Sequence, residues 1–202
     1  MSITRSFEKH FLLHAVFEGW LGPEMSSALL AYARANESRF FISPIRKYDE
    51  ITLDFDKRIS MMLKDLGPFA DPLRSRAVAM APQLCARFGA EDFAPKHVEL
   101  ELIAHGDGAF FFPHRDTQSG PSVPSAVRRL TLVYYLCSQP KRFTGGQLRL
   151  YSAHGGSVLD IEPAHDRLLA FPSMAPHSVE RVYCPGVPFA DWRFTVNIWL
   201  HG

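Results

Sequence analysis

The sequence predicts an α+β protein that is mainly β, in which helices come first and a barrel or sandwich of short strands follows. The second half holds seven or eight short segments, most of them rich in β-branched and aromatic residues and separated by turn-forming clusters. The first half contains segments with apolar residues at helical spacing. Many short strands at hairpin spacing are typical of a β-barrel or a β-sandwich.

Length and composition indicate a single domain. The chain has 202 residues, which is enough for one domain with a sizeable hydrophobic core. We expect residues 1–95 to form a mostly helical support region and residues 96–202 to form the β core. The helices should pack on the outside of that core, within the same domain.

In the first half, a short apolar strand is expected at Phe11–Leu21 and a helix over residues 22–38. Two further helices are expected at Phe55–Gly67 and Pro72–Gly89, because each pattern ends at a glycine. Pro82 lies inside the last of these patterns, where it either kinks the helix or begins a new one. The strands expected in the second half cover residues 97–106, 128–137, 146–153, 157–163, 167–173, 177–184 and 193–202.

The charge pattern, the cysteines and the N-terminal segment exclude several classes of protein. A net charge of +1 with interspersed signs argues against an electrostatic nucleic-acid binder. Three scattered cysteines argue against a disulfide framework and for a reducing compartment. The first residues are charged throughout, unlike a signal peptide, and no apolar run approaches the roughly 18 residues of a membrane span. We therefore expect a cytoplasmic protein without membrane contact.

Three histidines are each followed two residues later by a carboxylate, at positions 97 and 99, 105 and 107, and 114 and 116. Residues i and i+2 of a strand point to the same face, so such a pair can bind one metal ion. The first pair lies in an alternating segment typical of a solvated strand face, and the second in the turn sequence HGDG. His114 and Asp116 instead follow the apolar run AFFFP, so they can project from the end of a buried strand into a cavity.

A third ligand would have to come from elsewhere, and His177 is a candidate. It begins a strand-like segment directly after a buried strand and a proline-bounded turn. Two imidazoles and one carboxylate form the facial triad of non-haem Fe(II) oxygenases. The sequence chemistry alone leaves open the alternative that His177 is a hydrogen-bonded loop histidine.

The last predicted strand contains an arginine whose orientation the pattern leaves open. Arg193, Thr195, Asn197 and Trp199 would share one face of this strand. If that face points inward, the buried arginine needs an anionic partner and becomes a candidate fork for a carboxylate ligand. If it points outward, the arginine is solvated. Tyr135 could offer its hydroxyl to the same ligand, or it is an ordinary half-buried tyrosine.

Taken in order, the motifs FFFPHRDT, RRLTLVYYLC, GGQLRLY, LLAFPSMAPHSVERV and RFTVNIWLH resemble those of the Fe(II)- and 2-oxoglutarate-dependent dioxygenases, specifically the prolyl-4-hydroxylase-like branch. The resemblance runs from about Glu99 to His201, about half of the chain. It implies a double-stranded β-helix, which is a jelly-roll or cupin-like barrel of two sheets.

The resemblance also implies roles for particular residues. Three would bind the catalytic iron: His114, Asp116 and His177. Four would bind 2-oxoglutarate: Arg193, Tyr135, Leu148 and Asn197. Three would contact the substrate: His105, Arg128 and Trp199.

The chain departs from the family pattern at two places. His177 and Arg193 are 16 residues apart, more than is usual in this branch, and the extra residues predict a longer hairpin loop. His105 stands where many members carry a tyrosine. Asp116 is present, whereas members that halogenate lack this carboxylate, so hydroxylation is the expected outcome.

The family implies Fe(II) as cofactor, 2-oxoglutarate and O2 as cosubstrates, and ascorbate as a supporting reductant. The expected reaction hydroxylates an unactivated C–H bond and releases succinate and CO2. The substrate would be a prolyl or other peptidyl residue, or a free amino acid, and the protein would be a monomer or homodimer. Two alternatives are a cupin-like metal-binding protein without oxygenase activity and a non-catalytic β-barrel binding module.

Overall fold

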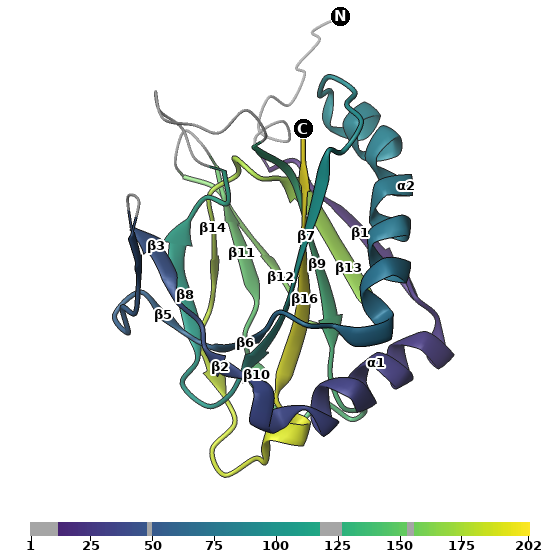
Figure 1. Cartoon of the computed structure of the whole chain (residues 1–202). Helices are drawn as coiled ribbons and strands as arrows, with labels where there is room; N and C mark the ends of the chain where they lie inside the picture. The colour runs from purple at the N-terminus through teal and green to yellow at the C-terminus, as the bar shows by residue number, and fades with distance from the viewer. Residues whose placement is uncertain (1–11, 48–49, 118–126, 153–155) are drawn as a thin grey trace, which may run out of the picture.

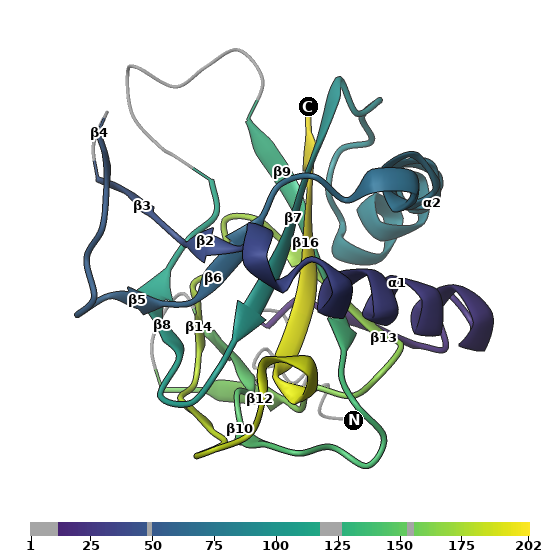
Figure 2. The same cartoon turned by 60° about the horizontal axis from the view of Figure 1, so that its bottom comes forward.

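The computed structural model describes residues 12–47, 50–117, 127–152 and 156–202. Within these residues two antiparallel sheets face each other, and two α-helices cover the outer side of the larger sheet (Figures 1 and 2). This arrangement is a double-stranded β-helix with packing helices. The predicted fold class is therefore confirmed.

The larger sheet has seven strands, in the spatial order β1 (Ala15–Glu18), β13 (Arg167–Pro172), β9 (Arg128–Leu136), β16 (Arg193–His201), β7 (His97–His105), β6 (Met61–Leu63) and β2 (Phe41–Ile42). The smaller sheet has five strands, in the order β12 (Val158–Ile161), β11 (Leu148–Tyr151), β14 (His177–Val179), β8 (Phe110–His114) and β5 (Arg58–Ile59). Two ribbons pair β3 (Ile45–Lys47) with β4 (Glu50–Thr52), and β10 (Thr144–Gly145) with β15 (Val182–Tyr183). The helices are α1 (Pro23–Ala35) and α2 (Ala70–Phe88), with short 3-10 turns at Glu37–Arg39, Gly67–Phe69 and Phe189–Asp191.

The helices bury their apolar sides against the larger sheet. Leu29 of α1 and Leu73 of α2 have no exposed surface, and they belong to the same core cluster as Leu132 of β9. The leucine-bearing face of β9 thus packs beneath the helices. The opposite face of β9, with Thr131 and Tyr135, points toward the space between the sheets.

Helix α2 passes Pro82 without interruption, so this proline neither ends the helix nor begins another. Gly89 ends the helix in the left-handed conformation at φ 63°, which glycine adopts without steric cost. The backbone N–H of Ala90 then donates to the carbonyl oxygen of Cys85 at 3.0 Å. The predicted glycine stop is thereby confirmed.

The helix predicted at Phe55–Gly67 is wrong, because this segment contains β5 and β6. Met62 pairs with Ile103 of β7, and the side chains of Met62 and Leu63 are buried. A short apolar run fits a helix or a strand equally well, and pairing with a long neighbouring strand decides the outcome here. Residues 1–95 therefore contribute strands to both sheets as well as the helices.

Every strand predicted in the second half is present, with one change. Residues 177–184 form two strands rather than one, since β14 belongs to the smaller sheet and β15 pairs with β10 in a separate ribbon. In the first half, the strand expected at Phe11–Leu21 is the shorter β1, which pairs with β13. No helix in the described part of the chain is long and apolar enough to cross a membrane.

Asp166 joins the start of α1 to the larger sheet. Its carboxylate accepts hydrogen bonds from the backbone N–H groups of Leu21 and Gly22, at 2.8 and 2.9 Å, and from the hydroxyl of Tyr134 at 2.8 Å. Asp166 is buried and has φ 58°, a left-handed conformation that aspartate tolerates better than most residues. This side chain therefore holds the helical layer in place on the sheet that carries the site.

Candidate metal and cosubstrate site

Three candidate metal ligands come together where β8 ends and β14 begins. His177 is the antiparallel register partner of His114, and Asp116 follows β8 by two residues. Ligand atoms of the three residues all lie within 4.8 Å of one another. The two imidazole Nε2 atoms, of His114 and of His177, each lie 3.6 Å from one oxygen of the Asp116 carboxylate.

Backbone carbonyl groups orient both imidazoles. The Nδ1 atom of His114 lies 2.8 Å from the carbonyl oxygen of Phe112, and that of His177 lies 2.9 Å from that of Ala175. Each Nδ1–H can donate to its carbonyl, which leaves the Nε2 lone pair directed toward the carboxylate. Because a metal-binding histidine commonly donates its other ring N–H in this way, both rings are oriented with Nε2 as the ligand atom.

Aromatic rings and hydroxyl groups enclose the cluster. The ring of Phe111 stacks on His114 with centroids 3.6 Å apart, and Phe171 contacts His177 edge-on at 4.8 Å. The hydroxyl of Thr131 donates to Oδ2 of Asp116 at 2.8 Å. These contacts fix the positions of the side chains and keep them partly from solvent.

The electrostatic environment gives two of these side chains the protonation states that a metal ion requires. Burial alone would raise the pKa of Asp116, but the charge of His177, followed by the hydrogen bond and charge of His114, holds that pKa well below its usual range. Burial lowers the pKa of His177 to about 4, with a further contribution from His114. At neutral pH Asp116 is therefore an anion and His177 a neutral imidazole.

Deeper in the cavity, Arg193 is 1% exposed and has hydrogen bonds on only part of its guanidinium. Its Nε donates to the carbonyl oxygen of Gly146 at 2.9 Å, and its Nη1 lies 2.9 Å from Nδ1 of His105. Its Nη2 and the hydroxyl of Tyr135 are both buried without a hydrogen-bond partner among the described residues. Buried donors without acceptors are costly, so an anion that accepts from both would satisfy them.

These two donors fit a carboxylate. Burial raises the pKa of Tyr135 to about 12, so the phenol keeps its proton at neutral pH. Burial also lowers the pKa of Arg193, but a guanidinium stays charged far above neutral pH. The inward orientation of Arg193, one of the two left open by the sequence, is the one that the structure has.

His105 lies behind Arg193 rather than in a turn. It is the last residue of β7 and the register partner of Arg193 on β16. Burial, followed by the charge of Arg193, lowers the pKa of His105 well below its ordinary value of 6.5. The imidazole is therefore neutral, and its Nδ1 accepts a hydrogen bond from Arg193.

The cluster and the buried arginine open into one cavity of about 660 Å³ between the two sheets. Of the ten residues to which the sequence assigned site roles, nine line this cavity, and only Tyr135 does not. Tyr135 instead packs beneath Leu148 in the apolar cluster between the sheets, with its ring beside the guanidinium of Arg193. The chain thus brings the whole predicted set into one region.

Arg128 and Trp199 form part of the outer wall of the cavity, on the same side as Glu99. Arg128 donates two hydrogen bonds to the carboxylate of Glu99, at 3.0 and 2.7 Å, and its guanidinium carbon lies 3.8 Å from the ring centroid of Trp199. The strand face that was expected to be solvated is exposed at His97, but Glu99 on the same face is only partly exposed and lines the cavity. Side chains of Glu99 and Glu101 line the cavity, because this face of β7 is turned toward the smaller sheet.

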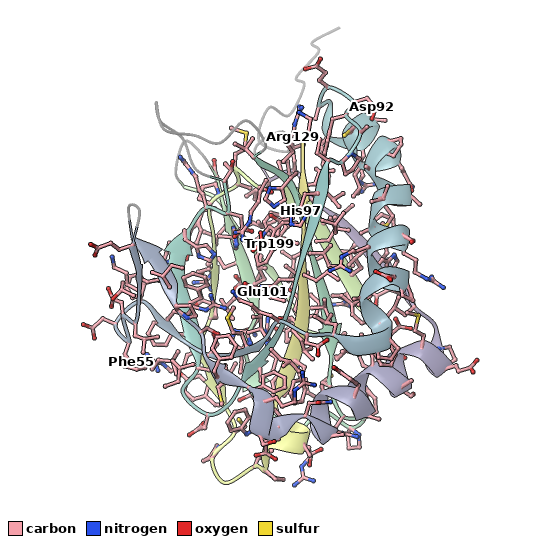
Figure 3. All side chains as sticks on the ribbon, viewed as in Figure 1. Phe55, Asp92, His97, Glu101, Arg129 and Trp199 are labelled. Atoms are coloured by element: carbon pink, nitrogen blue, oxygen red, sulfur yellow. The ribbon has the colours of Figure 1, made fainter. Side chains whose placement is uncertain are left out.

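Arg58 and Glu101 are among the cavity residues to which sequence reasoning assigned no role. Arg58 lies on β5, in the segment for which a helix was predicted. Glu101 lies on the polar face of β7, which was interpreted as solvated (Figure 3). The alternation of polar residues along β7 was the available signal, since an enzyme cavity can present a polar strand face as readily as solvent does.

Comparison with curated proteins gives partial matches. The chain is 35% identical over 136 residues to an uncharacterised PKHD-type hydroxylase of Synechocystis sp., which covers 63% of this chain and 44% of that protein. It is 32% identical over 95 residues to Egl nine homolog 1 of Homo sapiens, which covers 46% of this chain and 21% of that protein. The chain thus spans less than half the length of these curated relatives.

Solved structures share the fold over nearly the whole chain. A prolyl hydroxylase from Trichoplax adhaerens, solved in complex with a hypoxia inducible factor peptide fragment, superposes with a TM-score of 0.68 at 20% identity, over 99% of this chain and 94% of that chain. A prolyl-4-hydroxylase from Pseudomonas putida superposes with a TM-score of 0.61 at 23% identity, over 93% of this chain and 91% of that chain.

The family match covers the strands that build the site. Residues 100–201 match the model of the 2OG-Fe(II) oxygenase superfamily, a stretch that runs from β7 to the end of β16 and includes the cluster of His114, Asp116 and His177. The chain therefore belongs to the 2OG-Fe(II) oxygenase superfamily.

Proposed function

We propose that the protein is an Fe(II)- and 2-oxoglutarate-dependent dioxygenase that hydroxylates an unactivated C–H bond of its substrate. Membership of the superfamily implies iron, 2-oxoglutarate and O2. The observation that carries the proposal is the combination of a two-histidine, one-carboxylate cluster with a buried, incompletely satisfied arginine in the same cavity. A facial triad of this composition leaves coordination positions open for cosubstrates.

In this proposal His114, Asp116 and His177 hold the iron, and Arg193 and Tyr135 bind the distal carboxylate of 2-oxoglutarate. The iron and 2-oxoglutarate together supply oxidative decarboxylation with O2, which gives succinate, CO2 and a hydroxylated substrate. The protein supplies orientation and shielding. Phe111 covers one face of His114, and the apolar side chain of Leu148 lines the same cavity.

The substrate class remains part of the proposal. The relatives named above include prolyl hydroxylases, which favours a prolyl or other amino-acid substrate, either within a peptide or free. Asn197, Trp199 and Arg128 line the cavity beyond Arg193 and are proposed to contact the substrate or cosubstrate. We propose that His105 supports 2-oxoglutarate binding by orienting Arg193, rather than by contacting the substrate.

We also propose that the protein works in a reducing compartment, with the cytoplasm as the expected location. Cys85, Cys137 and Cys184 are all buried and unpaired, which fits such a compartment. A monomeric or homodimeric state and the absence of nucleic-acid and membrane partners stay predictions from the sequence.

The direct test is succinate formation from 2-oxoglutarate by the purified protein with Fe(II) and ascorbate. We expect turnover that is abolished in Asp116→Ala and retained in the control Arg74→Gln, which changes an exposed residue of α2. Anaerobic 2-oxoglutarate binding to the Fe(II)-loaded protein, followed by visible absorption, provides a readout independent of turnover. Metal binding without 2-oxoglutarate binding would favour a cupin-like metal protein, and no metal binding would favour a non-catalytic barrel.

A further inference from the structure

The outer part of the cavity presents two opposite charges from opposite walls. Glu101 comes from β7 in the larger sheet, and Arg58 comes from β5 in the smaller sheet. Both line the cavity that contains the candidate metal cluster. The two side chains form no ion pair with each other or with any other residue in the described part of the chain.

Glu101 is half-buried and makes no hydrogen bond with the described residues, although it lies beside Asn197 in the register of β7 and β16. Burial raises the pKa of this carboxyl group, and the charge of Arg58 opposes that effect. A carboxylate that loses water on burial without gaining a partner is unfavourable. A cationic group of a ligand would supply the missing partner.

Arg58 is held beside the three candidate metal ligands, and one of its guanidinium nitrogens has no hydrogen-bond partner among the described residues. Its Nε donates to the hydroxyl of Ser60 at 2.8 Å, and its Nη1 donates to the carbonyl oxygen of Pro44 at 3.3 Å. The guanidinium carbon lies 4.8 Å from the ring centroid of Phe111, the same ring that stacks on His114. No hydrogen bond to Nη2 is formed by the described residues. Burial lowers the pKa of Arg58 to about 10, so the side chain is still a cation at neutral pH.

Some of the other charged side chains on the cavity wall already have a partner or a proposed role, whereas Lys64 and Arg115 line the cavity without an ion pair among the described residues. Arg128 forms a two-bond pair with Glu99, and Arg193, whose Nη2 has no partner among the described residues, is already assigned to the carboxylate of 2-oxoglutarate in the proposed function. Arg58 and Glu101 differ from Arg128 and Glu99, because they line the same cavity and influence each other's pKa without forming an ion pair. A ligand that carries both an ammonium and a carboxylate group complements such a pair.

We propose that the outer part of the cavity is a subsite for a zwitterion, in which Glu101 binds the ammonium group and Arg58 the carboxylate group of a free amino acid. This inference rests on the proposed function and selects one of the two substrate classes that it leaves open. An internal residue of a peptide has neither charge on its backbone and would leave both side chains unmatched. The expected reaction hydroxylates a C–H bond in the side chain of the amino acid. One oxygen atom of O2 enters this product and the other enters succinate, as 2-oxoglutarate is converted to succinate and CO2.

The test compares three forms of each candidate amino acid: the free L-amino acid, its N-acetyl derivative and its C-terminal amide. Proline-containing peptides with blocked ends form a fourth group. The measurement is 2-oxoglutarate turnover above the background without substrate, together with mass-spectrometric detection of the hydroxylated product. We expect at least one free L-amino acid to be hydroxylated with a lower KM than its blocked forms and than any blocked peptide.

Two variants assign the charges to the two groups. We expect Glu101→Gln to raise KM for the free amino acid roughly ten- to a hundredfold, and to have little effect on its N-acetyl derivative, which has no ammonium group. Arg58→Gln should have the corresponding effect on the free amino acid and little effect on the amide. Lys57→Gln is the matched control, since Lys57 is the exposed neighbour of Arg58 and lines the same cavity.

Anaerobic 2-oxoglutarate binding and turnover without substrate show separately whether each variant is folded and whether the proposed function holds. If both are intact and blocked peptides are better substrates than every free amino acid, the zwitterion subsite is overturned. The same conclusion follows if Glu101→Gln and Arg58→Gln leave the KM of the free amino acid unchanged. If wild-type protein neither binds nor consumes 2-oxoglutarate, the proposed function fails, and this inference fails with it.

Discussion

The Nδ1 atom of His105 lies 2.9 Å from Nη1 of Arg193, and both side chains are almost completely buried. With the carbonyl oxygen of Gly146 on Nε, this contact fixes the plane of the guanidinium and leaves Nη2 as the donor without a partner among the described residues. Gly146 allows this close approach, because a Cβ atom there would lie 2.7 Å from Cδ of Arg193. His105 is therefore a positioning residue for the arginine that we propose to bind 2-oxoglutarate.

Replacing His105 by Phe should weaken 2-oxoglutarate binding, because Arg193 would lose a charge-assisted hydrogen bond and its fixed orientation. We expect the Kd for 2-oxoglutarate to rise roughly tenfold or more in anaerobic titrations of the metal-loaded protein. His105→Gln keeps an acceptor on a side chain of similar length and should recover part of the affinity. A Kd in His105→Phe equal to that of wild type would show that the contact is merely a packing feature.

The same residue should make folding stability depend on pH. His105 is neutral in the folded protein, with a pKa well below 6.5, whereas an unfolded chain protonates it near that value. Below about pH 6.5 the unfolded state therefore binds one more proton, and the stability due to this residue, complete above that pH, is lost as pH falls.

The contribution of His105 to the slope of the unfolding free energy against pH should reach about 1.4 kcal/mol per pH unit between its folded and unfolded pKa values. His105→Gln cannot take up that proton, so its free energy of unfolding should fall less steeply between pH 6.5 and 5. Urea unfolding of both metal-free proteins across this range gives the comparison. Parallel curves would mean that His105 is already protonated in the folded protein.

The residues that sequence reasoning placed well are those whose environment is set by their own strand. The spacing of two residues between His114 and Asp116, directly after an apolar run, can be read from the sequence alone. The fold then brings both side chains to His177 because β8 and β14 pair. The orientation of Arg193 could not be decided, since both faces of β16 are largely buried and either register would pack. Arg58 was missed because β5 has two residues, too few for any period to appear.

Thr131 should strengthen metal binding through Asp116, although we propose no contact between Thr131 and the metal. Its hydroxyl donates to Oδ2 of the carboxylate at 2.8 Å and also lies 2.9 Å from the hydroxyl of Ser173. Removal of such an outer hydrogen bond commonly costs tenfold or more in metal affinity. We expect about this loss for Fe(II), or for Mn(II) as a probe, in Thr131→Val, measured by competition with a chelator. Thr131→Ser keeps the hydroxyl and should bind nearly as well as wild type, and equal affinities for Val and Ser would argue against the effect.

Asp166 should matter for stability rather than for chemistry, because it lies on the far side of the larger sheet from the cavity and joins α1 to β9. Asp166→Ala removes the acceptor of three hydrogen bonds and leaves the N–H groups of Leu21 and Gly22 and the hydroxyl of Tyr134 to find other partners. Buried polar groups that lose their partner each cost about 1–3 kcal/mol, so we expect a loss of about 3 kcal/mol or more in the free energy of unfolding.

Asp160→Asn is the control, since the exposed pair of Asp160 with Arg149 should contribute at most about 1 kcal/mol. Denaturant unfolding measures both, and the affinity of the still-folded Asp166→Ala protein for 2-oxoglutarate should equal that of wild type. A weakened affinity at unchanged stability would instead place Asp166 in the support of the binding site.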